Sequence, residues 1–574
     1  MMIKKELNQK KKTWLIDLWF IVGFIIISLA FTLGRIGLHF GDFLLSSSDS
    51  ANISSFVAAL DQPKLFINDT LLKNPANFAF YNTIHIPLIR WLGQILGNYS
   101  SPFALLIFPF TFLHLLGYYW LGKAITKNRF WALFFSLAVL IPVRLVLGES
   151  WGLMPDILPR FLFQSLLPFL LTALVRWGKN PKSWPWLMVA TGLLVYVHPV
   201  SLPAWGLAVI LSLWVLSPEM PVKQKVLRLL FAAFLFLVVI TPFTINYLST
   251  TTFGLQGSIN YEDLLIIMRK RFITGFLDLD LAFKEFIKTT IISDWYVVLI
   301  WAFVFFGGIG IFFTKRKTKD KNHLILAAWW AAVFIVGVLI PIIDHGLANF
   351  LKRMPLEVDL IRNLRYVIPL LLLSAFYLLS EFQLIIAKKN LLKSRPMNTA
   401  IFICLGLLLL AGWILRNDFL HNSTFVQSAH CWASGQLTCP FQDEDKVRQR
   451  IELLEAIKTI TPTGSRIMAS TDLSELVIRY YALRPLIYSY KDGSALIYSN
   501  HTDLLIWWQQ FQEINQIETR NTRVLYLNGL VEFSRKYLAD YLVLPETFSL
   551  QKYYPAGLDK VFTNTGYSLF HVAY

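Results

Sequence analysis

The sequence predicts a polytopic α-helical membrane protein with a small α/β domain at its C-terminal end. Of the 574 residues, 55% are hydrophobic and only 16% are charged, well below the roughly 25% of charged residues in soluble domains. Apolar runs long enough to cross ~30 Å of hydrocarbon recur along residues 1–415. The composition changes at about residue 416, and over residues 443–574 short strand and helix patterns alternate instead. We therefore divide the chain into a transmembrane domain, 1–415, and an α/β domain, 416–574.

The net charge of +17 is explained by the positions of the basic residues. They gather in six short clusters between apolar runs, at residues 4–12, 123–129, 176–182, 223–228, 315–321 and 388–395. Basic loops remain on the cytoplasmic side of a membrane, so these clusters predict a cytoplasmic N-terminus. No basic patch with interleaved aromatic residues is left over, so we expect no nucleic-acid partner.

With the basic clusters inside, the apolar runs predict about eleven transmembrane helices. They lie near residues 14–34, 102–121, 130–147, 160–176, 184–198, 202–217, 229–247, 291–314, 323–343, 364–386 and 399–415. An odd number of spans puts the α/β domain on the extracytoplasmic face of a plasma (inner) membrane. The first outer loop, 35–101, contains an amphipathic helix at 53–60 and a short hydrophobic stretch at 84–96. The loop 248–290 mixes basic and apolar residues and favours a helix in the membrane interface.

The C-terminal region has the alternating pattern of a small α/β domain. Strands are predicted at 465–470, 484–491 and 540–546, helices at 472–483 and 503–514, and a hairpin at 559–574 with its turn at 563–566. Cys431 and Cys439 lie in the polar stretch that precedes all of these elements. They form either a disulfide or two free thiols. Cys404 lies in an apolar run.

Carboxylates gather in the first two loops expected outside the membrane. Asp42 and Asp49 follow the first span, and Glu149 and Asp156 stand in the second outer loop. Carboxylate oxygens are the ligands that Mg²⁺ or Mn²⁺ prefers, and an unliganded carboxylate can take the proton of an acceptor hydroxyl. The simpler interpretation is that these acids cap helices or face water. Ser48 and Asp49, for example, precede an apolar-periodic stretch, where a helix N-cap is expected.

Three further features indicate substrate binding. Arg362 and Arg365 are three residues apart on one helix face at the outer end of a predicted span, where they could pair with a lipid phosphate. The alternative is a snorkelling pair or a salt bridge to Asp359 or Glu357. His198, near the end of an apolar run, is either a ligand-binding group or a buried hydrogen-bonded residue. Lys491 lies in an aromatic-rich stretch, 479–500. This stretch either binds a glycan or forms an ordinary strand and turn.

Two absences narrow the function. The chain has no GxxxxGK[ST] nucleotide-binding loop and no HExxH zinc-protease motif. Its ionisable residues cluster at the outer ends of the predicted spans, whereas an ion-coupled transporter needs acids at mid-membrane.

The layout resembles that of the GT-C superfamily of membrane glycosyltransferases, over nearly the whole chain. The shared features are a basic cytoplasmic N-terminus, one span, a long first outer loop with Asp49, a second outer loop with Glu149 and Asp156, many further spans and an external α/β domain. The segments KDGSALIYSN and NTGYSLFHVAY also resemble the C-terminal regions of prokaryotic members.

The resemblance implies a site. Asp49 would be the catalytic base or a metal ligand. Asp42 is the alternative residue for this role, because it lies closer to the first span. Glu149 or Asp156 would complete a site for a divalent cation, Mg²⁺ or Mn²⁺. Arg362 and Arg365 would hold the phosphate of a polyprenyl-phosphate-linked sugar.

The leading hypothesis is therefore a glycosyltransferase that moves a hexosyl or pentosyl group from a polyprenyl-phosphate donor to an extracytoplasmic acceptor. Its expected partners are the lipid-linked donor, membrane lipids and an acceptor that is a glycan, a lipid or a protein. The alternatives are a transporter or flippase of lipid-linked glycans and a non-catalytic membrane scaffold.

Overall fold

The protein is described by a computed structural model. The structure describes residues 2–38, 44–45, 48–81, 83–145, 149–154, 156–250, 259–271, 278–315, 320–353, 355, 358–388, 395–416, 433–434, 444–470, 475–520, 522–546 and 557–574. Asp42, Cys431 and Cys439 lie outside these residues, so the predictions on them are not addressed. Cys404 is a free thiol on an exposed helix surface.

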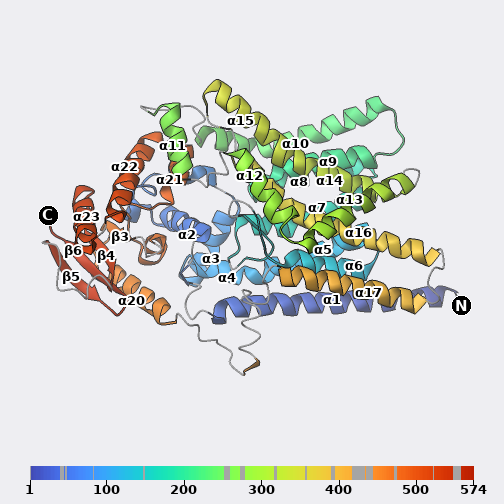
Figure 1. The fold of residues 1–574 in the computed structure, drawn as a ribbon, viewed down its shortest axis with the longest axis horizontal. Helices are drawn as coiled ribbons and strands as arrows, with labels where there is room; N and C mark the ends of the chain where they lie inside the picture. Colours follow the sequence, from blue (N-terminus) through green and yellow to red (C-terminus); the bar gives the residue numbers. More distant parts are fainter. Residues whose placement is uncertain are drawn as a thin grey trace.

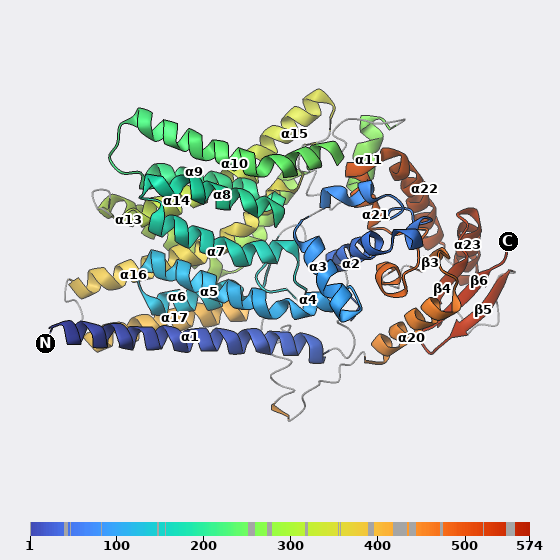
Figure 2. The ribbon, with the colours of Figure 1, turned by 180° about the vertical axis from the view of Figure 1, so that it is seen from behind.

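A bundle of apolar helices forms most of the molecule (Figure 1). Its first half consists of α1 (Met2–Leu38), α4 (Ser101–Leu105), α5 (Ile107–Thr126), α6 (Arg129–Leu140), α7 (Pro159–Trp177), α8 (Trp184–Leu193) and α9 (Leu202–Leu216). Its second half consists of α10 (Val222–Thr250), α13 (Trp295–Lys315), α14 (Asn322–Phe334), α15 (Ile340–Leu351), α16 (Val367–Lys388) and α17 (Arg395–Arg416). The N-terminus and the α/β domain lie at opposite ends of the long axis, as both views show (Figure 1, Figure 2).

Seven helical segments among the described residues are long and apolar enough to cross a membrane. They are Trp14–Ile36, Ser101–Thr126, Pro199–Leu216, Val222–Thr250, Trp295–Lys315, Asn322–Leu351 and Asp359–Lys388. Large apolar side chains such as Phe231 on α10 and Phe306 on α13 are exposed, as lipid contact requires. The chain is thus a multi-pass membrane protein. The other four predicted spans fall on α6, α7, α8 and α17, which are shorter or less apolar, so the count of about eleven is not established.

The described part of the segment predicted as the first outer loop, 35–101, contains helices that lie between the bundle and the α/β domain (Figure 1). They are α2 (Ser48–Asp61), the 3-10 turns η2 (Pro63–Phe66) and η3 (Pro75–Tyr81), and α3 (His85–Leu96). The predicted helix at 53–60 is confirmed within α2, and the stretch at 84–96 forms the amphipathic helix α3. The loop at 248–290 contains α11 (Tyr261–Arg271) and α12 (Leu279–Phe286), followed by the π-helical turn η9 (Ile287–Ile291).

The α/β domain contains one four-stranded sheet with the order β3-β4-β6-β5. The strands are β3 (Ile467–Ala469), β4 (Tyr541–Pro545), β5 (Leu558–Thr563) and β6 (Tyr567–Val572), and β3 pairs in parallel with β4 while the other pairs are antiparallel. The helices are α20 (Glu444–Ile460), α21 (Asp492–Ser499), α22 (His501–Glu518) and α23 (Arg523–Lys536). The predicted strands at 465–470 and 540–546, the helix at 503–514 and the hairpin are confirmed.

The predicted strand at 484–491 is wrong. Only one bridge, between Ile467 and Leu486, connects this segment to the sheet. Pro485 and Ile487 each share one backbone hydrogen bond with Ile467 of β3. The Leu486 N–H instead donates to Asp69, and the Ile487 carbonyl accepts from Thr70. The segment therefore joins the sheet to the first outer loop. The predicted helix at 472–483 is described from residue 475 and ends in a π-helical turn, η12 (Ile478–Ala482).

A buried ion-pair network fixes the α/β domain on the first outer loop. The Arg479 guanidinium donates to both Asp69 and Asp492, with donor–acceptor distances of 2.7–2.8 Å. Lys73 of the outer loop also pairs with Asp503 of α22 at 2.9 Å. Because Asp492 opens α21, this network also sets the position of α21 at the end of the helix bundle.

Candidate functional site

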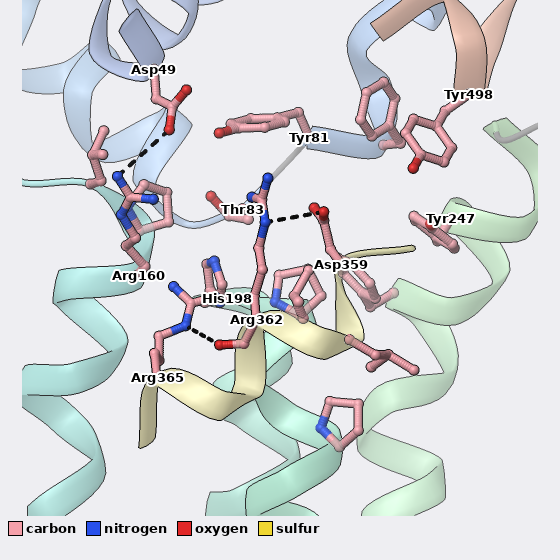
Figure 3. Close-up of a pocket in the computed structure, with 18 residues that line it drawn as sticks. Asp49, Tyr81, Thr83, Arg160, His198, Tyr247, Asp359, Arg362, Arg365 and Tyr498 are labelled. Atoms are coloured by element: carbon pink, nitrogen blue, oxygen red, sulfur yellow. Dashed lines mark hydrogen bonds and ion pairs between the residues drawn. The ribbon is translucent and has the colours of Figure 1, made fainter. Parts of the chain in front are cut away.

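A cavity of about 350 Å³ lies where the outer loop, the helix bundle and the α/β domain meet (Figure 3). The elements that contribute to its lining include α2, η3, α7, α10, the 3-10 helix η11 (Val358–Tyr366) and α21. The polar and aromatic side chains that line it include Asp49, Phe80, Tyr81, Thr83, Arg160, His198, Tyr247, Asp359, Arg362, Arg365 and Tyr498.

Glu149 holds three arginines at the base of this site. Its carboxylate lies 2.9 Å from Arg365 Nη1, 3.2 Å from Arg362 Nε and 3.4 Å from Arg160 Nη1. The acid is almost fully buried and directly precedes β2 (Ser150–Trp151), which pairs with β1 (Val143–Arg144) in a short hairpin. Burial alone would raise the pKa of Glu149, but the three guanidinium groups more than offset it and lower the pKa.

Two of these arginines share one face because of the local helix type. η11 is a 3-10 helix, in which residues i and i+3 eclipse one another, so Arg362 and Arg365 project in the same direction (Figure 3). The Arg365 Nε–H donates to the Arg362 carbonyl at 2.9 Å, and Arg362 Nε pairs with Asp359 at 3.1 Å. The prediction that the two arginines lie together is confirmed, and so is the proximity of Asp359.

Asp49 lies next to Arg160 on the charged side of the cavity (Figure 3). It stands in the first turn of α2 and pairs with Arg160 Nη2 at 3.8 Å and with Lys491 Nζ at 3.5 Å. Burial would raise the pKa of Asp49, but Lys491, Arg160 and Arg362 outweigh it and lower the pKa. Arg160 therefore bridges Asp49 and Glu149, which come from separate outer loops.

The remaining predicted residues lie around this centre. His198 lines the cavity, and its Nδ1 lies 2.8 Å from Ser201 Oγ. Lys491 is not among the lining residues given above, but it pairs with the lining residue Asp49. Asp156 pairs instead with Arg35 at 3.3 Å and accepts a hydrogen bond from Ser50, and it is not among the residues given above for the lining.

The described acids do not fit a shared cation site. Asp49, Glu149 and Asp156 each engage a cationic side chain rather than converge on one point, and the described residues contain no group of three side chains that could ligate a metal ion. A divalent cation needs several carboxylate or carbonyl oxygens within about 2.5 Å. We therefore derive no step through a metal.

The site has an excess of positive charge over its own carboxylates. Four cations, Arg160, Arg362, Arg365 and Lys491, pair with three acids, Asp49, Glu149 and Asp359. Guanidinium groups in this arrangement suit a phosphate, whose oxygens accept several N–H donors at once.

The sequence alone does not single out Arg160 and Tyr498. Arg160 follows Pro159, the first residue of α7, and a proline at that position is a common start of a helix, so the position of Arg160 in the first turn of α7 could have been inferred. Tyr498 lies near the end of α21, within the aromatic-rich stretch 479–500 for which a glycan was one interpretation, but no local pattern shows that this stretch lines a cavity with α2 and η11.

No protein-family model matches the chain, and no curated protein matches it significantly.

Proposed function

We propose that the protein is a membrane glycosyltransferase that moves a sugar from a polyprenyl-phosphate-linked donor to an extracytoplasmic acceptor. One observation carries the proposal: a single cavity at one end of the apolar helices is lined by a carboxylate, Asp49, and by the arginines Arg160, Arg362 and Arg365. Transfer of a sugar from a glycosyl phosphate requires a base for the acceptor hydroxyl and a group that binds the leaving phosphate.

The reaction follows from these roles. The acceptor hydroxyl oxygen attacks the anomeric carbon of the donor and forms the new glycosidic bond, with inversion. The bond from that carbon to the phosphate oxygen breaks, and its electron pair leaves with the polyprenyl phosphate. Asp49 takes the hydroxyl proton, while Arg362 and Arg365 stabilise the charge that develops on the phosphate.

The proposal also includes the orientation of the protein in the membrane. We propose about eleven spans in a bacterial plasma membrane, a cytoplasmic N-terminus and an extracytoplasmic α/β domain. Two observations support it: the basic clusters alternate between apolar runs, and the N-terminus and the α/β domain lie at opposite ends of the bundle (Figure 2). The cavity then lies on the extracytoplasmic side.

Sugar transfer in reconstituted vesicles tests the function. Purified protein is incubated with polyprenyl-phosphate donors carrying radiolabelled hexoses or pentoses and with lipid and glycan acceptors from the host envelope. We expect labelled product, and we expect Arg362→Gln to lower its rate by about 10²–10³-fold, as for the loss of a transition-state hydrogen-bond donor. The matched control is Arg353→Gln, since Arg353 pairs with Asp344 on α15 at 2.8 Å. Movement of the labelled lipid across the vesicle without covalent transfer would instead indicate a transporter.

A further inference from the structure

The cavity has two unlike walls. On one side lie the charged groups of Asp49, Arg160 and Arg362, and on the other lie the rings of Tyr247 and Tyr498, with Tyr81 extending between the two sides (Figure 3). Phosphate recognition accounts for the charged wall. It does not account for the rings, because a phosphate has no apolar face.

The aromatic wall is assembled from three distant parts of the chain. Phe80 and Tyr81 end η3 in the first outer loop, Tyr247 lies on α10, and Tyr498 lies on α21 of the α/β domain. The rings of Phe80 and Tyr498 lie 5.9 Å apart at 48°, and those of Phe80 and Tyr81 lie 6.2 Å apart, edge to face. These contacts place Phe80, Tyr81 and Tyr498 in one continuous surface.

We propose that this aromatic wall, Phe80, Tyr81, Tyr247 and Tyr498, binds a sugar ring, and that Tyr498 makes the α/β domain part of the specificity of the site. The inference rests on the proposed transferase function and deepens it. A pyranose ring has an apolar C–H face and a rim of hydroxyl groups. Aromatic rings pack against the C–H face, and tyrosine hydroxyls and carboxylates such as Asp359 form hydrogen bonds with the sugar hydroxyl groups.

The α/β domain holds Tyr498 in place before any ligand binds. The helix α21 begins at Asp492, which the buried Arg479 bonds through both carboxylate oxygens. Arg271 of α11 adds a hydrogen bond to Ser494 on the same helix, at 2.9 Å. A wall that is fixed in advance avoids the entropic cost of ordering side chains on binding.

Binding of soluble sugar phosphates tests the wall separately from catalysis. Full-length protein is placed in lipid nanodiscs, free of sugar-based detergent, and titrated by calorimetry with inorganic phosphate and with the 1-phosphates of glucose, galactose and mannose. We expect at least one hexose 1-phosphate to bind about tenfold more tightly than phosphate, the effect of one favourable aromatic contact. The same titration with methyl hexosides, alone and in the presence of phosphate, shows whether the sugar ring bound by the aromatic wall belongs to the donor or to the acceptor.

Variants of two tyrosines in the same domain localise the effect. Tyr498→Leu should abolish the advantage of the sugar phosphate and leave phosphate affinity unchanged, while Tyr498→Phe, which keeps the ring, should retain most of it. Tyr537→Leu is the matched control, because the Tyr537 hydroxyl bonds to Glu513 of α22 at 3.1 Å and Tyr537 is not among the residues given for the lining.

Each outcome decides the inference. Equal affinity for phosphate and for every sugar compound, or an advantage that survives Tyr498→Leu, overturns the aromatic wall but leaves the proposed transferase intact. Absence of phosphate binding together with retained sugar binding contradicts the anion site on which the transferase rests, and leaves the sugar wall standing.

Discussion

At the scale of single residues, the site is organised by Glu149. One buried carboxylate holds three guanidinium groups within 3.4 Å, so like charges that would repel one another are kept side by side. An acid in this position orients the three arginines at the base of the cavity. In the proposed transferase, Glu149 is a positioning residue and Asp49 is the acid that faces the reacting groups.

Replacing Glu149 by glutamine tests this role. Removing one partner of a buried ion pair costs about 3–5 kcal/mol, so Glu149→Gln should lower the melting temperature of the purified protein. Inorganic phosphate should restore more stability to the variant than to the wild type, because a bound anion replaces the lost charge. A variant that melts like the wild type, with or without phosphate, would contradict this role of Glu149.

The pH dependence of transfer follows from Asp49. Its pKa is lowered by Lys491, Arg160 and Arg362 despite burial, so the ionised, proton-accepting form is present above the ordinary pKa of 3.8 and is lost only as the pH falls below that value. We expect kcat/KM to show no acid limb due to Asp49 between about pH 5 and 8. An acid limb in that range that disappears in Asp49→Asn would show that the carboxylate has a raised pKa instead.

At the scale of elements, periodicity and charge predicted much of what the structure shows. The outer-loop helix α2, the pair Arg362 and Arg365, the strand β4 and the C-terminal hairpin all follow from local patterns. Beyond one bridge to β3, the segment at 484–491 does not form the predicted strand, because the Leu486 N–H and the Ile487 carbonyl bond to Asp69 and Thr70, more than 400 residues away. No local pattern contains such long-range pairings, and for the same reason the sequence did not show that Arg160 and Tyr498 line one cavity.

The junction between the outer loop and the α/β domain depends on Arg479. The variant Arg479→Met leaves Asp69 and Asp492 buried without their cation, so we expect a loss of about 3–5 kcal/mol, measured as a lowered melting temperature and as protease sensitivity of the α/β domain. Arg448→Met is the control, because Arg448 is 65% exposed and pairs with Asp445 at the surface; such pairs contribute under about 1 kcal/mol. Equal stability of the two variants would show that the network does not hold the domain.

At the scale of the whole molecule, composition predicted the class of protein but not the number of spans. Seven described segments meet the requirements of length and hydropathy, whereas α6 has only 12 residues and α8 only 10. Short helices in a bundle can be covered by their neighbours, so hydropathy alone does not decide whether each one crosses the bilayer.

Cysteine labelling of intact cells tests the proposed orientation. In a background with Cys404, Cys431 and Cys439 replaced by serine, a membrane-impermeant maleimide should label Tyr574→Cys in intact spheroplasts. It should label Lys179→Cys only after permeabilisation, because Lys179 lies in a basic loop. Both positions are exposed. The reverse pattern, or labelling of both positions from outside, would rule out this topology.

The central claim is that Asp49 is the base of a sugar transferase, and one comparison tests it most directly. Asp49→Asn and Asp61→Asn change two acids of the same helix, α2, but Asp61 bonds to Arg90 and Gln94 outside the group of acids and arginines at the cavity. The rate of sugar transfer from a polyprenyl-phosphate donor should fall by about 10²–10⁴-fold in Asp49→Asn and remain unchanged in Asp61→Asn. Transfer at the wild-type rate in Asp49→Asn would contradict the account, and if Asp42→Asn also left transfer intact, neither acid of the first outer loop would be the base.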